Sequence, residues 1–365
     1  MKGARRGSVC IRADGHARWI GAVAALLAFV PALGQDSSPD PLFLSDDPLA
    51  LTLTVDLRAL ELNTEAPRDH PATLSFENAA GAPIQLDAKL RPRGHSRRQL
   101  CDFPPLRLDL PKGEVADTVF ARQNKLKLVT HCVSMGKRSR NARAHVALEY
   151  LAYRMLNRLT EVSFLVRPLH VTYVDARSGR EHEHVAFVIE HKRRLAARLG
   201  WPVAEVDQIP KPQLDPEVTA RVDLFQFLIG NTDYSIVAGE PGEECCHNAI
   251  ALQRDNRYLP IPYDFDMSGL VNKPEAKPRR SLGIRSVRQR LYRGYCRDER
   301  YLDEAVDQYV AARDLLMEEV ARAAELFELS RASRMTADKF VDDFYTQVLL
   351  DPGQLERKIK RRCRE

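Results

Sequence analysis

Oxygen-bearing side chains recur in a fixed order between residues 229 and 269. Asp233 follows a Gly-Asn-Thr turn, Asn248 precedes one apolar strand and Asp264 follows the next. Phosphoryl transfer requires a carboxylate that orients the acceptor hydroxyl, and oxygen ligands that hold Mg²⁺ on the phosphates. Asp233 suits the first role, and Asn248 and Asp264 suit the second. A plain hairpin is the alternative, because Asn, Asp and Gly dominate turns, but it leaves the acids at the far end of an apolar strand unexplained.

The first 34 residues have the pattern of a secretory signal, because four arginines precede an apolar run from Trp19 to Leu33. Residues 35–48 form a polar linker, and no later segment is long or apolar enough to span a bilayer. Removal of the signal lowers the formal net charge from +5 to +1, so nucleic-acid binding is not expected. We expect an exported protein, periplasmic or extracellular. A retained N-terminal anchor is the alternative.

Six of the seven cysteines lie beyond residue 34. An even number in an exported chain predicts up to three disulfides, and the pairing stays open. Cys245-Cys246-His247 could instead bind Zn²⁺ through thiolate and imidazole ligands. The basic tail at residues 356–365 predicts a solvated helix end, with a polyanion contact as the alternative.

Apolar residues alternate with polar ones through most of the first half. This pattern predicts strands at 49–57, 72–76, 84–90, 106–110, 125–129, 164–174 and 185–190. Helical spacing predicts helices at 141–159 and 218–229, a further helix from Tyr301 onward and two more through Lys360. The layout predicts an α+β, two-lobed protein-kinase-like fold, with a β-rich N-terminal lobe at 49–190 and a mainly helical C-terminal lobe at 191–365.

Four ordered pieces of the chain match one known group of proteins. They are Arg93-Gly94-His95-Ser96-Arg97, Lys125-Leu126-Lys127-Leu128-Val129, Phe187-Val188-Ile189-Glu190, and the series Asp233, Asn248 and Asp264. Together they resemble the spore-coat-protein-H (CotH) kinase-like family of secreted atypical kinases. The resemblance covers most of residues 84–269, and Asp264-Phe265-Asp266 near a Gly is the closest match. The chain lacks a GxGxxG phosphate loop, and fifteen positions separate Asp233 from Asn248, a longer gap than in protein kinases.

The resemblance implies a role for each residue that matches the catalytic, metal-binding and phosphate-binding positions of the family. Asp233 would orient the acceptor hydroxyl and receive its proton. Asn248 and Asp264 would bind the metal, with Asp266 as a supporting acid, and Lys127 would bind the α and β phosphates.

Three further residues complete the expected nucleotide site. Arg93 would contact the phosphates, although a solvated basic turn fits its segment equally well, and Glu190 would lie at the hinge beside the adenine. Glu149 lies on the apolar face of the helix predicted at 141–159, at i, i+3 and i+4 spacing with apolar residues. A carboxylate on such a face requires a cation. We expect Lys127 or Lys125 to supply it, with the arginines of the same helix as the alternative.

The resemblance therefore predicts transfer of the ATP γ-phosphoryl group to a protein or other hydroxyl acceptor, with Mg or Mn as the metal. The main alternative is a catalytically inactive pseudokinase, or a structural envelope protein that serves as a binding platform. A metal-dependent nucleotide-sugar transferase is a third possibility, because Asp264-Phe265-Asp266 also has the form of an Asp-x-Asp metal clamp.

Overall fold

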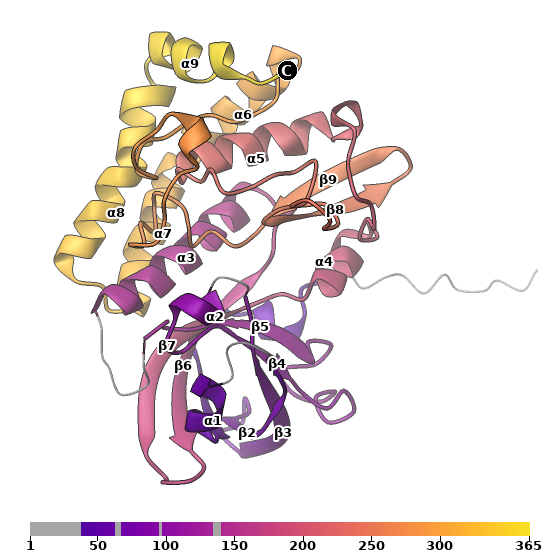
Figure 1. The fold of residues 1–365 in the computed structure, drawn as a ribbon, viewed down its shortest axis with the longest axis vertical. Coiled ribbons are helices and arrows are strands. Elements are labelled where there is room, and N and C mark those ends of the chain that lie inside the picture. The colour runs from indigo at the N-terminus through magenta and orange to yellow at the C-terminus, as the bar shows by residue number, and fades with distance from the viewer. Residues whose placement is uncertain (1–37, 63–66, 95–96, 134–139) are drawn as a thin grey trace, which may run out of the picture. The chain divides into compact units, whose positions relative to one another are not determined.

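The computed structural model describes residues 38–62, 67–94, 97–133 and 140–365 (Figure 1). The predicted secretory signal, residues 1–34, lies outside the described residues, as do the first residues of the predicted linker. In the part of the chain that is described, no helix combines the length and the apolar character needed to cross a membrane.

Seven strands close into a barrel in the order β1-β2-β3-β4-β5-β7-β6 (Figure 1). Their bounds are Leu49–Val55 (β1), His70–Glu77 (β2), Pro83–Pro92 (β3), Leu106–Asp109 (β4), Lys125–Val129 (β5), Val166–Asp175 (β6) and Glu181–Ile189 (β7). Neighbouring strands are antiparallel except β1 and β6, which pair in parallel from Leu49 with Leu169 to Val55 with Asp175. Leu53, Leu74 and Leu90 are fully buried in the core that the barrel encloses.

The two-lobed protein-kinase-like fold expected from the sequence is wrong. The predicted strands are present, but they form a closed seven-stranded mixed barrel, with most of the helices C-terminal to it. Closure depends on the parallel pair of β1 and β6, whose partners are far apart in the sequence. Hydrophobic alternation indicates a strand but not its neighbour, and a parallel partner has no hairpin turn to announce it.

Helices make up most of the remaining structure. Their bounds are Leu57–Leu62 (α1), Arg97–Leu100 (α2), Arg140–Leu159 (α3), Lys192–Leu199 (α4), Pro216–Leu228 (α5), Glu299–Ala311 (α6), Arg313–Leu326 (α7), Arg331–Phe344 (α8) and Pro352–Lys358 (α9). The helices predicted at 141–159 and 218–229 are confirmed as α3 and α5. The helix predicted from Tyr301 is divided at Ala312 into α6 and α7, and the two beyond it are confirmed.

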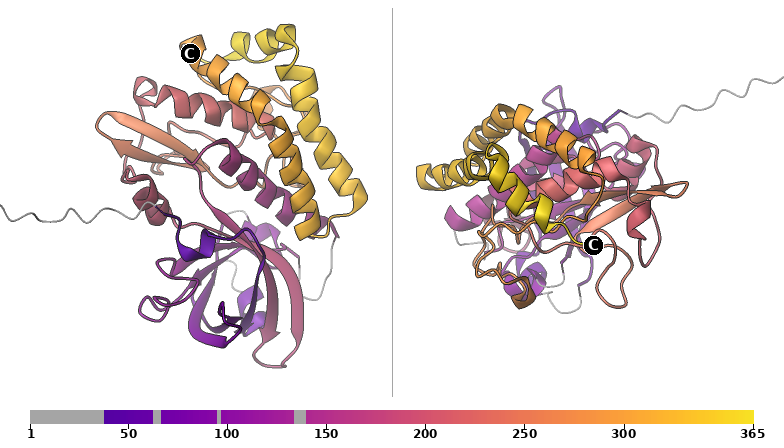
Figure 2. Two further views of the ribbon diagram at one scale, coloured as in Figure 1. Left: turned by 180° about the vertical axis from the view of Figure 1, so that it is seen from behind. Right: turned by 90° about the horizontal axis from the view of Figure 1, so that it is seen from above.

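A second hydrophobic core lies among the helices, and α3 belongs to it. Figure 2 shows α7 and α8 side by side, and α7 packs against α3. Strand β7 separates the two cores, because Ala186 and Val188 belong to the barrel core while Phe187 contacts Tyr150 and Tyr153 of α3. Burial of both faces explains the continuous apolar run of this strand.

Candidate active site

Helix α5 leads directly into the loop that carries Asp233. Gly230 adopts a left-handed φ of +64°, and a Cβ at this position would lie 3.0 Å from the Val287 carbonyl oxygen, so a larger residue does not fit. The side-chain oxygen of Asn231 then accepts a hydrogen bond from the Asp233 backbone N–H at 2.9 Å. The Asn231 amide itself donates to Gln226 of α5 at 2.9 Å. The backbone at Asp233 is therefore fixed from the helix.

The sequence-distant His247 and Asn248 converge on Asp233. His247 Nε2 lies 3.1 Å from Asp233 Oδ1. The Asn248 side-chain amide donates to the Asp233 backbone oxygen at 2.7 Å and to Oδ2 at 3.1 Å. The hydrogen bond to Asp233 raises the pKa of His247 above its ordinary value, against the effect of partial burial. The side chain of Asp233 remains 35% exposed, so a bound molecule can reach its carboxylate.

The hairpin of β8 (Ala249–Arg254) and β9 (Arg257–Pro262) supplies the apolar strands expected between Asn248 and Asp264, and its register places Asn248 opposite Tyr263, the residue before Asp264. The Tyr263 backbone N–H donates to the Asn248 backbone carbonyl oxygen at 3.0 Å, just beyond the paired residues. Asn248 and Asp264 have φ values of 50° and 61°, a left-handed conformation uncommon for residues other than Gly. The Asp264 N–H donates to the hydroxyl of Tyr153 on α3 at 2.8 Å. Helix α3 thus helps to hold this acid in place.

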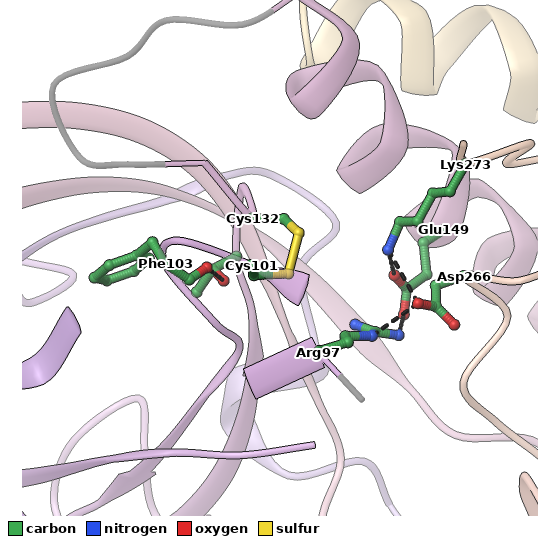
Figure 3. Close-up of a disulfide and its surroundings, with 8 residues drawn as sticks. Arg97, Cys101, Phe103, Cys132, Glu149, Asp266 and Lys273 are labelled. Carbon is green, nitrogen blue, oxygen red and sulfur yellow. Dashed lines mark hydrogen bonds and ion pairs between the residues drawn. A yellow bond between two sulfur atoms is a disulfide. The ribbon is translucent and has the colours of Figure 1, made fainter. Parts of the chain in front are cut away.

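Five charged residues form what we call the buried ion cluster: Arg97, Glu149, Asp264, Asp266 and Lys273. Arg97 contacts all three carboxylates, at 3.2 Å from Glu149, at 2.8 Å from Asp266 and in close contact with Asp264. Lys273 lies 3.1 Å from Asp266 and 3.9 Å from Glu149. Figure 3 shows Arg97 and Lys273 reaching the acids from different segments of the chain. The side chains of Glu149 and Asp266 are only 1% and 7% exposed, which makes these contacts strong.

Burial and charge compete within the cluster. Burial raises the pKa of Glu149, and Arg97 and Lys273 offset this effect only in part. Burial also favours the neutral form of Asp266, but Arg97 and Lys273 overcome it and lower the pKa of that carboxyl. The three acids hold the pKa of Arg97 well above its ordinary value despite its burial. Arg97 is therefore a permanent cation at the centre of the cluster.

Glu149 does have cationic partners on its apolar helix face, as the spacing predicted, but they are Arg97 and Lys273 instead of the expected lysines of β5. Lys125 lies 3.9 Å from Asp109. Lys127 lies over the Tyr263 ring, 4.1 Å from its centroid. The alternative pairing within α3 does not occur either, because Arg154 and Arg158 both contact Glu319.

Arg93 and Lys127, the two predicted phosphate ligands, are cations that do not belong to the buried ion cluster. Within the described residues, neither side chain has an ion-pair partner, and the buried Nε of Arg93 has no hydrogen-bond acceptor. Burial lowers the pKa of Lys127 to about 8, and the nearby Arg93 adds to this effect. Burial likewise lowers the pKa of Arg93, with a further contribution from Arg97. This pair of sites would be stabilised by an anion, since uncompensated buried charge is costly.

Glu190 is buried in a local ion pair. Both of its carboxylate oxygens accept hydrogen bonds from Arg198, at 3.1 and 2.8 Å. One oxygen also accepts the Leu165 backbone N–H at 3.1 Å. These contacts account for its burial without a ligand, so its predicted place beside an adenine gains no support from its side chain.

The six cysteines in the described ranges form three pairs, which confirms the predicted disulfides: Cys101–Cys132, Cys245–Cys246 and Cys296–Cys363. Because Cys245 and Cys246 are bonded to each other, they are not thiolate ligands for the zinc site considered as an alternative. The first disulfide joins the residue after α2 to the segment after β5 (Figure 3). It thereby connects the helix that carries Arg97 to the strand that carries Lys127.

The predicted metal ligands fit a divalent cation unequally. Asn248 donates from its amide nitrogen, which leaves its side-chain oxygen available, and Asp264 is 32% exposed. An amide and a carboxylate oxygen are acceptable Mg²⁺ ligands when phosphate and water complete the shell. Asp266 fits poorly, because Arg97 and Lys273 already occupy it. No cluster of three or more His, Cys, Asp or Glu side chains suited to a metal occurs in the described ranges.

Two members of the site were not predicted, Lys273 and Tyr153. The sequence signal for Lys273 was indirect, because a buried acid requires a cation without indicating which one. Arg97 was noted only as part of the basic segment that begins at Arg93, and it binds carboxylates. His247 was considered only as a zinc ligand. A scan against models of known protein families and a search of curated proteins find no match to this chain.

Proposed function

We propose that this protein binds a nucleoside triphosphate and transfers its γ-phosphoryl group to a hydroxyl acceptor. The observation that carries the proposal is the pair Arg93 and Lys127, neither of which has an ion-pair partner among the described side chains. Burial lowers the pKa of both, Arg93 lowers the pKa of Lys127 further, and the Asp264 carboxylate offsets these effects only in part. A polyphosphate supplies several negative charges and hydrogen-bond acceptors at once. Binding it would remove the cost of holding two cations near each other without an anion.

Asp233 is the residue proposed to orient the acceptor. Its backbone is held by Asn231, its carboxylate contacts His247 and Asn248, and its side chain is accessible. During transfer the acceptor oxygen would form a bond to the γ-phosphorus, the bond to the nucleoside diphosphate would break, and the hydroxyl proton would pass to Asp233. Asn248 and Asp264 are the residues that would hold Mg or Mn, and a bound metal would neutralise charge on the phosphates.

The compartment proposed is outside the cytoplasm. Three disulfides form and persist readily in oxidising environments and are uncommon in the cytosol. Together with the signal pattern of residues 1–34, they support an exported protein, periplasmic or extracellular. The resemblance to CotH-like kinases supports the activity through sequence pieces alone and does not extend to the fold.

The test uses γ-labelled ATP with Mg or Mn and the disulfide-bonded protein. Wild type should transfer label to a hydroxyl-bearing acceptor or to itself, and Asp233→Asn should abolish transfer while nucleotide binding persists. Lys127→Met should weaken binding. Lys125→Met is the matched control, because Lys125 lies two residues earlier on the same strand with a side chain that is 54% exposed. Absence of transfer by wild type with either metal would refute the proposed activity.

A nucleotide-binding platform without catalysis is the second candidate, and Arg97 is the observation that favours it. Its guanidinium contacts Asp264, one of the two acceptable metal ligands, and thereby competes with a metal for that carboxylate. The platform predicts that ATP raises the thermal transition equally with and without Mg, and that no label is transferred. The kinase predicts a larger increase with Mg, since the metal would then bind with the nucleotide.

A further inference from the structure

A basic loop borders the proposed acceptor site. It is anchored on one side by Lys273 in the buried ion cluster, 3.1 Å from Asp266. On the other side, Arg288 donates to the Gly269 carbonyl at 3.3 Å. The Val287 carbonyl packs against Gly230, three residues before Asp233. The stretch between these anchors is therefore held next to the Asp233 loop.

Residues 277–285, which we call the basic loop, contain four cations and no acid: Lys277, Arg279, Arg280 and Arg285. All four side chains are exposed. Only Arg279 has an ion-pair partner among the residues described, namely Glu240 at 2.6 Å. The other three present unpaired positive charge to solvent.

A chain of contacts connects the basic loop to Asp233. Glu240, the partner of Arg279, lies 3.6 Å from Nδ1 of His247. The opposite ring nitrogen of His247 lies 3.1 Å from Asp233. A molecule that binds the basic loop would thus lie beside the carboxylate proposed to orient the acceptor.

We infer that the acceptor is an acidic peptide segment, in which carboxylates bind the basic loop while a neighbouring hydroxyl reaches Asp233. This inference rests on the proposed function. Guanidinium groups bind carboxylates through paired hydrogen bonds, which favours Arg280 and Arg285 as contacts. Each exposed contact is weak, so several acidic residues would be needed together. Charge complementarity of this kind mainly sets the choice of partner and the rate of encounter.

Acids of the neighbouring loop provide the internal control. Glu243 and Glu244 are exposed on the segment that also carries Glu240. These two acids would favour a basic acceptor, whereas the basic loop would favour an acidic one. Glu275, two residues before the basic loop, is also exposed. The basic loop itself contains no acid, so its three unpaired cations favour the acidic acceptor.

The experiment compares three serine peptides of equal length, flanked by Glu, by Gln or by Lys, as acceptors for γ-labelled ATP. Wild type should prefer the Glu peptide in kcat/KM, and 0.5 M NaCl should reduce the preference because exposed contacts are screened. In the double variant R280E/R285E, the ratio of kcat/KM for the Glu peptide to that for the Gln peptide should fall about tenfold, because several contacts, each worth a few-fold, are removed or reversed. The variant E243Q/E244Q should retain it. Equal use of the three peptides, or preference for the Lys peptide, would overturn the inference.

A binding measurement separates this inference from the proposed activity. Fluorescence anisotropy of a labelled Glu-flanked peptide on Asp233→Asn reports docking without transfer. Docking that R280E/R285E abolishes would support the acidic partner even if no label is ever transferred. Transfer to a neutral peptide without any docking of the acidic one would support the activity and refute the inference. Thermal unfolding of R280E/R285E checks that the variant is folded.

Discussion

The chain has 55 lysines and arginines, and the loss of one of them would ordinarily matter little. Replacement of Arg97 by Met should nevertheless lower the free energy of unfolding strongly. Its guanidinium contacts Glu149 and Asp266, whose side chains are 1% and 7% exposed, and it also contacts Asp264. Removing one partner of a buried ion pair costs about 3–5 kcal/mol, because the remaining charge stays buried. Lys273 remains beside both acids and compensates in part, so we expect a loss of about 3 kcal/mol.

Urea unfolding at pH 7 under oxidising conditions measures this free energy. Arg91→Met is the matched control, because the Arg91–Asp69 pair is 37% and 34% exposed and should contribute at most about 1 kcal/mol. Adding Glu149→Gln to Arg97→Met should restore about 1–3 kcal/mol, since the two residues are coupled. A loss below about 1 kcal/mol for Arg97→Met, or no recovery in the double variant, would refute the role of Arg97 as the central cation.

Three further outcomes follow from the structure. Nucleotide affinity should fall as the pH rises from 7 to 9, because Lys127 loses its proton near its pKa of about 8, and Lys127→Arg should remove this dependence in calorimetric titrations. Stability to urea should fall below pH 6.5, because burial lowers the pKa of His131 and only the unfolded chain takes up that proton; His131→Phe should reduce the slope by up to about 1.4 kcal/mol per pH unit. Serine replacement of Cys296–Cys363, which closes a 67-residue separation, should cost about 4 kcal/mol with nucleotide affinity unchanged, whereas the same replacement of Cys101–Cys132 should weaken nucleotide binding.

The sequence predicted local structure well because local patterns determine it. Alternation of apolar residues marked β1 and β6, and helical spacing marked α3 and α5. It did not predict the closed barrel, because the parallel pairing of β1 with β6 joins segments that have no turn between them. The two-lobed fold was predicted from the order of strands and helices along the chain, and the closed barrel contradicts it.

The candidate site was predicted only where local structure determines it. Asp233 and Asn248 meet because a hairpin and a loop, both visible in the sequence, bring them together. A cationic partner for Glu149 was predicted correctly, but the residues expected to supply it, Lys127 or Lys125, were wrong, since a carboxylate on an apolar face requires a cation of any origin. Arg97 and Lys273 reach it from segments whose places depend on the tertiary fold.

Titration of the wild-type protein with a non-hydrolysable ATP analogue and Mg²⁺, in parallel with Lys127→Met and Lys125→Met, tests the central claim most directly. The claim is that a nucleotide's phosphates supply the anionic partner that Arg93 and Lys127 do not have among the described side chains. We expect wild type to bind, Lys127→Met to bind at least about tenfold more weakly, and Lys125→Met to bind within about twofold of wild type, because hydrogen bonds to charged groups contribute about 1.5–3 kcal/mol. Failure of the wild type to bind, or equal affinities for all three proteins, would contradict the claim.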